Sequence, residues 1–128
     1  MNRELKFRAW RKTSKEMMLW DNLKDFHEDT SSYIFDDDQI VMQYTGLLDK
    51  NEVEIYEDDI VEDFLNEPAV VKFGSYMAGG TDYYASKAYG FYVQRLYKGE
   101  VIDEDDTETL RNCHTVIGNI YQNKDLIK

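Results

Sequence analysis

The sequence contains one cysteine, one proline and two histidines among its 128 residues. Because Cys113 has no partner within the chain, we expect the fold to form without a disulfide, in a reducing cytoplasm. No run approaches the roughly eighteen apolar residues that a membrane helix needs. Residues 1–12 also lack the apolar centre of a signal peptide. We therefore expect a soluble protein with no membrane association.

Residue types that usually carry chemistry are scarce. His27, His114 and Cys113 do not supply the four ligands of a structural zinc site. Cys113 and His114 would point to opposite faces of a strand, which argues against a catalytic nucleophile and base. The acidic residues of 57–62 lack the EF-hand spacing, and no phosphate-binding or dinucleotide-binding glycine motif is present. We expect no catalytic residue, cofactor or metal, and thus a protein that is not an enzyme.

Basic residues are fewer than acidic ones: 15 against 26, for a formal net charge of −11. This charge repels a polyphosphate backbone, so nucleic-acid binding is not expected. The acidic residues cluster at 36–38, 57–63 and 103–108, and we expect these runs in solvated loops or turns. A second cluster, near the start, is basic and comprises Arg3, Lys6, Arg8, Arg11, Lys12 and Lys15. It could attract the acidic remainder of the chain across a subunit contact.

Short alternating apolar runs are what the sequence does provide. Residues 40–45 alternate as a strand does, and Gly46 marks a bulge or turn at positive φ. The polar residues 49–52 predict a hairpin turn before a strand at 53–56. Ile60 and Val61 predict the next strand, after a tight acidic turn.

The same patterns continue on both sides of this region. They predict a first hairpin over 3–20 with its turn at 12–15, and strands at 69–73, 89–96 and 115–121. Gly74 is expected to end the 69–73 strand, and the loop from Tyr76 to Ala88 is the expected place for mobility. Gly118 predicts a bulge or a close backbone approach, and Asn123 is expected to cap a helical turn through Ile127.

These elements favour one mainly β domain over residues 1–128. Short antiparallel strands with one or two short helical turns predict a small curved sheet or barrel rather than an α/β enzyme fold. The first hairpin would occupy 3–20 and the barrel-like core about 40–121. Residues 21–35 are expected to form a loop with one helical turn, and 103–108 a loop or the start of a short helix.

Three separated stretches resemble the phage-associated YopX-like family. They are LKFRAW at 5–10, the region from MQYTGL at 42–47 to DIV at 59–61, and VIGNIY at 116–121. The residues that carry the resemblance are Phe7, Arg8, Trp10, Gln43, Tyr44, Thr45, Gly46, Tyr56, Asp59, Gly118, Asn119 and Tyr121. It implies a small, mainly β protein with an SH3-like barrel element, encoded by a phage or prophage and located in the cytoplasm of the bacterial host.

This chain departs from the family at two turns. The family usually has glycine at the positions of Glu52 and Asp58. We expect Asn51, which tolerates the left-handed region, to take over the first turn, and Asp58 to hold the second by an Asx turn.

Aromatic residues gather between positions 76 and 97. Tyrosine joins a large apolar body to a polar tip, which suits both a core and a contact surface. The candidate interaction residues are Tyr76, Tyr83, Tyr84, Tyr89, Tyr92 and Tyr97. Single-stranded nucleic acid also stacks on aromatic platforms, but normally beside a positive groove. The nearby cations here are Lys72, Lys87, Arg95 and Lys98.

Three functional hypotheses follow. The first is a non-enzymatic phage or prophage accessory protein that forms a homo-oligomer and binds a host or phage protein through strand edges and tyrosines. The second is an acidic DNA mimic that binds a nucleic-acid-binding protein of the host. The third is direct nucleic-acid binding by the basic first hairpin.

Overall fold

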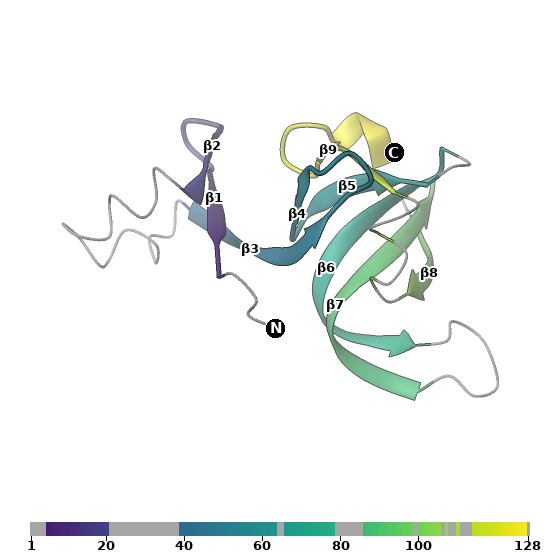
Figure 1. Ribbon diagram of the computed structural model, residues 1–128. Coiled ribbons are helices and arrows are strands. Elements are labelled where there is room, and N and C mark those ends of the chain that lie inside the picture. The colour runs from purple at the N-terminus through teal and green to yellow at the C-terminus, as the bar shows by residue number, and fades with distance from the viewer. Residues whose placement is uncertain are drawn as a thin grey trace.

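A computed structural model describes residues 5–20, 39–63, 66–78, 86–98, 100–105, 107, 110 and 114–127. Within these ranges the chain is mostly β structure in two antiparallel sheets (Figure 1). One sheet has four strands in the order β2-β1-β3-β4, and the other has five in the order β8-β7-β6-β5-β9. The five-stranded sheet curls into a half-barrel (Figure 1). The predicted mainly β fold with a curved sheet is thus confirmed.

The strands of the first sheet are β1 (Phe7–Arg11), β2 (Glu16–Met18), β3 (Gln39–Leu48) and β4 (Glu54–Tyr56). Those of the second sheet are β5 (Asp59–Glu62), β6 (Pro68–Ala78), β7 (Ser86–Tyr97), β8 (Glu100–Asp105) and β9 (Thr115–Asn119). A short 3₁₀ helix, η2 (Lys124–Ile127), follows β9. No helix among the described residues is long and apolar enough to cross a membrane. The predictions for 21–35 and for the acidic run 36–38 lie outside the described residues.

The first hairpin and the central strand form where the sequence predicts them. The β1–β2 turn covers residues 12–15. Strand β3 pairs antiparallel with β1 on one side and with β4 on the other. Gly46 has a φ of 86°, and the β3–β4 register shifts between Tyr44 and Leu48. The predicted bulge is therefore confirmed, and it lets β3 bend from one sheet toward the other (Figure 1).

The turn after β3 is built around a buried carboxylate. Asp49 Oδ1 accepts hydrogen bonds from the N–H groups of Asn51 at 2.7 Å and Val53 at 2.9 Å. Asp49 Oδ2 accepts one from the N–H of Val116 at 2.9 Å, which joins the turn to β9. The left-handed residue of this turn is Glu52, with a φ of 66°. The expectation that Asn51 would take this conformation was wrong, because Asn51 N–H is held by Asp49.

The main apolar core lies against one face of the second sheet. Its buried members are Ile55, Val61, Ala69, Val71, Val93 and Leu110. Val71 and Val93 are direct partners across β6 and β7, so the period of two places their side chains on the same face. Full burial of a side chain of this size stabilises the fold by about 1.5–3 kcal/mol.

The β6–β7 hairpin is longer than the sequence suggested. Gly74 does not end β6; it pairs with Gly90, and both residues have a φ of 148°. A side chain added at either glycine would meet nothing within 4 Å, so the conformation, not crowding, requires glycine there. The predicted loop at Tyr76 to Ala88 was also too wide, because β6 extends to Ala78 and β7 begins at Ser86.

Two more predictions near the end of the chain need correction. The acidic run 103–108 is not wholly a loop, because β8 continues to Asp105 along β7. Asn123 does not cap η2 with its side chain; its Oδ1 accepts a hydrogen bond from the N–H of Asn119 at 3.1 Å. That contact fills the space beside Gly118, where an added Cβ would lie 2.4 Å from Asn123 Oδ1. A register shift opposite Gly118 confirms the predicted bulge and close approach.

Candidate functional site: a polar junction and a long hairpin

The three motif stretches meet at one junction between the two sheets. Arg8 on β1 donates a hydrogen bond from Nη2 to Asp59 Oδ1 on β5 at 2.7 Å. The same nitrogen donates to the Glu57 carbonyl oxygen at 3.2 Å. The Arg8 and Asp59 side chains are 9% and 2% exposed, so both charges are largely removed from water. A buried pair of this kind fixes the position of β1 on the second sheet.

Asp59 also holds the tight turn between β4 and β5. Its Oδ2 accepts a hydrogen bond from the Tyr56 N–H at 2.8 Å. Burial raises the pKa of the Asp59 carboxyl, although the nearby Arg8 guanidinium and the Tyr56 N–H act in the opposite direction. The Arg8 guanidinium lies over the Tyr56 ring, 4.7 Å from its centroid. Burial, followed by the charge of Glu54, raises the pKa of Tyr56 to about 12.

A second carboxylate network lies directly beside this pair. Asp58 is 6% exposed, yet its backbone has a φ of 69°, in the left-handed region. Its Oδ1 accepts a hydrogen bond from Lys72 Nζ at 3.1 Å, and its Oδ2 accepts one from the Tyr121 hydroxyl at 2.7 Å. The expected Asx turn was wrong, because this carboxylate bonds across the sheet to β6 and to the C-terminal turn. Burial, then the hydrogen bond to Asp58, raises the pKa of Tyr121.

Aromatic rings complete the junction. Trp10 stacks on Tyr121 with centroids 5.6 Å apart, and Tyr44 packs against Tyr56 at 5.4 Å. Thr45 Oγ1 donates to the Ile55 carbonyl oxygen at 2.7 Å. The remaining motif residues hold the backbone of the same region. Phe7 is the strand partner of Gln43, and Asp59 is the strand partner of Asn119. Asn119 Oδ1 also accepts hydrogen bonds from the N–H groups of Tyr121 and Gln122. The motif residues therefore build the connection between the sheets.

The acidic run 57–63 is not the solvated segment that we expected. Asp58, Asp59 and Asp63 are all less than 9% exposed. Asp63 lies 3.8 Å from Arg95, and the other two are paired as described above. The expectation was wrong because Arg8, Lys72 and Arg95, from other parts of the sequence, lie beside these carboxylates and offset the cost of burying them. Part of the basic cluster is also engaged within the chain, since Lys6 forms an ion pair with Glu54 and Arg8 one with Asp59.

The four candidate tyrosines that lie among the described residues do not form one surface. Tyr76 and Tyr92 stack on one face of the β6–β7 hairpin at 5.0 Å, and Tyr92 is only 9% exposed. Tyr89 is on the opposite face and is 76% exposed. Side chains alternate between the two faces of a strand, so Tyr97, which is 63% exposed, lies on the same face as Tyr89. Tyr83 and Tyr84 lie outside the described residues.

Tyr89 belongs to a set that we call the aromatic row, made of Phe73, Tyr89 and Phe91. Phe73 contacts Phe91 at a centroid distance of 4.8 Å and Tyr89 at 5.4 Å, both edge to face. The row continues the apolar face of Val71 and Val93 beyond the core, where Phe73 is 42% exposed. The candidate interaction residues predicted from the sequence include Tyr89 but neither Phe73 nor Phe91, although the alternation of the 89–96 strand places residues 89 and 91 on one face.

Of the two histidines and the cysteine, only His114 lies among the described residues. His114 is buried, and Cys113 lies outside the described residues. Among the residues that the structure describes, no group of three or more His, Cys, Asp or Glu side chains could hold a metal ion. Glu57 Oε1 accepts a hydrogen bond from the Gln43 N–H at 3.4 Å, and burial raises the pKa of the Glu57 carboxyl.

Fold and junction together define a class: a small β protein in which a four-stranded sheet is tied to a curled five-stranded half-barrel by the buried Arg8–Asp59 ion pair. The chain belongs to the YopX family, whose model, described as YopX protein, matches residues 6–128. The crystal structure of protein EF1440 from Enterococcus faecalis is similar, with 25% sequence identity and a TM-score of 0.50. That likeness covers 99% of this chain and 100% of the other. A search of curated proteins finds no match.

Proposed function

We propose that this protein is a non-enzymatic interaction module that self-associates, with the aromatic row as its contact surface. The observation that carries the proposal is the exposure of Phe73 and Tyr89 on a hairpin that reaches away from the first sheet (Figure 1). Aromatic side chains are enriched at the centres of protein interfaces, where they supply much of the binding energy. Such a cluster on a soluble domain favours a partner that covers it.

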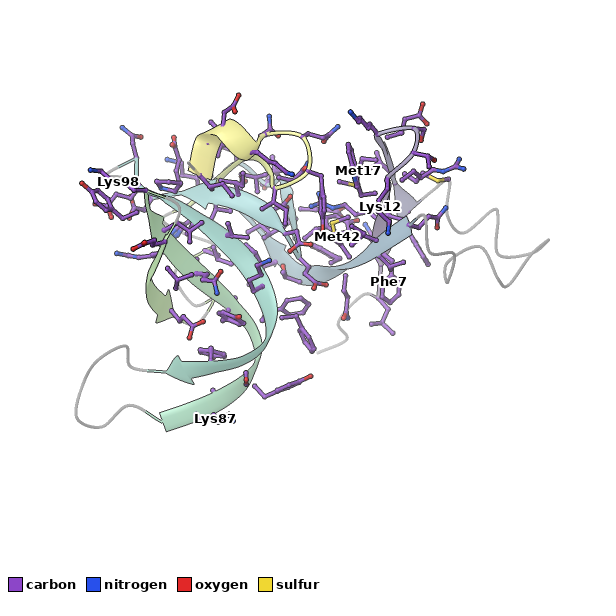
Figure 2. The ribbon with its side chains drawn as sticks, turned by 180° about the vertical axis from the view of Figure 1, so that it is seen from behind. Phe7, Lys12, Met17, Met42, Lys87 and Lys98 are labelled. Carbon is purple, nitrogen blue, oxygen red and sulfur yellow. The ribbon has the colours of Figure 1, made fainter. Side chains whose placement is uncertain are left out.

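Charge favours a second copy of the chain as that partner. Residues 68–98 contain four basic residues, and of the 26 acidic residues only Asp82 lies there. Lys87 and Lys98, both exposed, lie at the two ends of β7 (Figure 2). Lys72 and Arg95 are paired with Asp58 and Asp63, so Lys87 and Lys98 carry the positive charge that the aromatic hairpin presents to solvent, on a protein of net charge −11. The hairpin complements the acidic remainder of another copy, and such pairing is weakened by salt.

In the cell, we propose that the protein acts as a phage or prophage accessory factor in the bacterial cytoplasm, and that a host or phage protein can use the same row. The DNA-mimic alternative has less support, since Asp58, Asp59 and Asp63 are buried and face cations of the same chain. Nucleic-acid binding by the first hairpin also has less support, because Lys6 and Arg8 form ion pairs within the chain.

The test compares two exposed apolar residues in different places. Tyr89→Ser removes the most exposed ring of the row, and Leu19→Ser removes a 58% exposed side chain next to β2. We expect light scattering to show concentration-dependent oligomers for the wild type and Leu19→Ser, and a shift to monomer for Tyr89→Ser. Wild-type protein that stays monomeric at every concentration, and that retains nothing from a cell lysate, would refute the proposal.

A further inference from the structure

A groove lies on the face of β6 and β7 opposite the core. Its apolar lining comes from Val70 on β6, Leu96 on β7, and Ile120 and Ile127 near the C-terminus. Val70 alternates with the core residue Val71, which places it on the other side of the sheet. The groove has a volume of about 520 Å³, within the roughly 300–1,000 Å³ of typical small-molecule sites.

The buried Asp58 carboxylate of the junction fixes the position of two polar side chains of the groove. Lys72 and Tyr121 line it, and both are held by the Asp58 carboxylate at 3.1 and 2.7 Å. Gln94 and Lys124 are the other polar lining residues. Asp58 is buried in a left-handed backbone conformation that ordinarily disfavours residues other than glycine. Backbone strain of this kind is often retained where it positions functional groups.

The charge balance of the groove selects the class of ligand. Its lining contains two ammonium groups and no carboxylate, on a protein whose net charge is −11. Asp58 offsets the charge of Lys72, so Lys124, which is exposed, supplies the excess positive charge. An apolar floor with one excess cation suits an apolar body that ends in a single negative group.

We propose that this groove binds a small amphipathic carboxylate. The apolar body lies against Val70, Leu96, Ile120 and Ile127, and the carboxylate lies at Lys124 and Lys72. This site is on the opposite face of the hairpin from the aromatic row, so it is independent of the proposed self-association.

Octanoate and 1-octanol are the probes, because they share an apolar chain and differ in charge. Binding is followed on the full chain by the amide NMR signals of Ile120, Tyr121 and Lys124, and by fluorescence of Trp10, which stacks on Tyr121. We expect saturable shifts with octanoate and weaker binding of octanol. We expect Lys124→Gln to weaken octanoate binding roughly two- to fivefold, as loss of an exposed ion pair does, and to leave octanol unchanged. Lys87→Gln removes another exposed lysine, far from the groove, and is expected to change the binding of neither probe (Figure 2).

A second variant tests the apolar part of the site. Ile127→Ser is in η2, which contributes no buried residue to the core, so the fold should be retained. We expect it to weaken both probes. The proposal is overturned if octanoate gives no saturable shift, if Lys124→Gln and Lys87→Gln bind octanoate equally, or if the shifts fall on Phe73 and Tyr89. It is also overturned if a peptide with an apolar C-terminus binds the groove more tightly than octanoate, since that result would assign the site to a protein partner.

Discussion

The Trp10 ring stacks on the Tyr121 ring with an angle of 19° between their planes. One residue belongs to the first motif of the chain and the other to the last. Tyr121 is in turn hydrogen-bonded to Asp58, next to the Asp59 that pairs with Arg8. The motif residues therefore form one continuous contact between the two sheets.

Removing one partner of the buried Arg8–Asp59 ion pair should destabilise the fold strongly. Removing one partner leaves the other charge buried, so Arg8→Ala should lower the free energy of unfolding by about 3–5 kcal/mol. Lys6→Ala removes a cation from a pair whose side chains are 20% and 37% exposed, and should cost no more than about 1 kcal/mol. Urea unfolding followed by tryptophan fluorescence measures both. Equal losses for the two variants would show that Arg8 does not connect the sheets.

Glu52 and Asp58, which both have a left-handed backbone, should respond differently to glycine. Glu52 is exposed, so Glu52→Gly relieves its backbone strain and should stabilise the protein by about 0.5–1 kcal/mol. Asp58→Gly relieves the same strain but removes the bonds to Lys72 and Tyr121, and should destabilise the protein by about 1–2 kcal/mol. Thermal unfolding of both variants gives the comparison. Stabilisation by Asp58→Gly would mean that the carboxylate network contributes little.

Two glycines should be required for different reasons. Gly118→Ala places a Cβ 2.4 Å from Asn123 Oδ1, so it should destabilise the protein by about 1–3 kcal/mol, and Asn123→Ala should partly rescue it. Gly74→Ala meets no atom but forces alanine to a φ of 148°. It should cost about 1–3 kcal/mol, with no rescue by Asn123→Ala. A double-mutant cycle by chemical denaturation separates the two cases, and rescue of both glycine variants would contradict this explanation.

Part of the stability that the fold loses in acid should come from protonation of Asp49. Burial acts to raise the pKa of this carboxyl, but hydrogen bonds from the N–H groups of Val116, Val53 and Asn51, and the charge of Lys50, lower it overall. A lowered folded-state pKa gives stability that is present above the unfolded value of about 3.9 and is lost as pH falls through the folded value. Asp49→Asn should therefore be less stable at neutral pH and lose less stability in acid. Parallel stability curves from pH 7 to 3, measured by urea unfolding, would contradict this role.

The sequence predicts the short elements of this fold well because they rest on local rules. The alternation around Met42, the turn at 12–15 and the bulge at Gly46 each need only neighbouring residues. The length of the β6–β7 hairpin could not be predicted in this way. Gly74 looks like a terminator in a single strand, and only its pairing with Gly90 lets both strands continue through the bend.

The junction was predictable only in part. The motif residues were identified, but their contacts join positions about fifty residues apart, as in Arg8 and Asp59. Local charge rules place acidic runs in solvent, whereas tertiary pairing buries Asp58 and Asp59.

Self-association through the aromatic row, with Lys87 and Lys98 beside it, is the central proposal. Sedimentation equilibrium of the wild-type protein at about 0.1 M and about 1 M salt tests this directly, since the screening length falls from about 10 Å to about 3 Å over that range. We predict association that increases with protein concentration in low salt and weakens markedly in high salt. A monomer at every concentration in low salt, or an association that salt does not change, would contradict it.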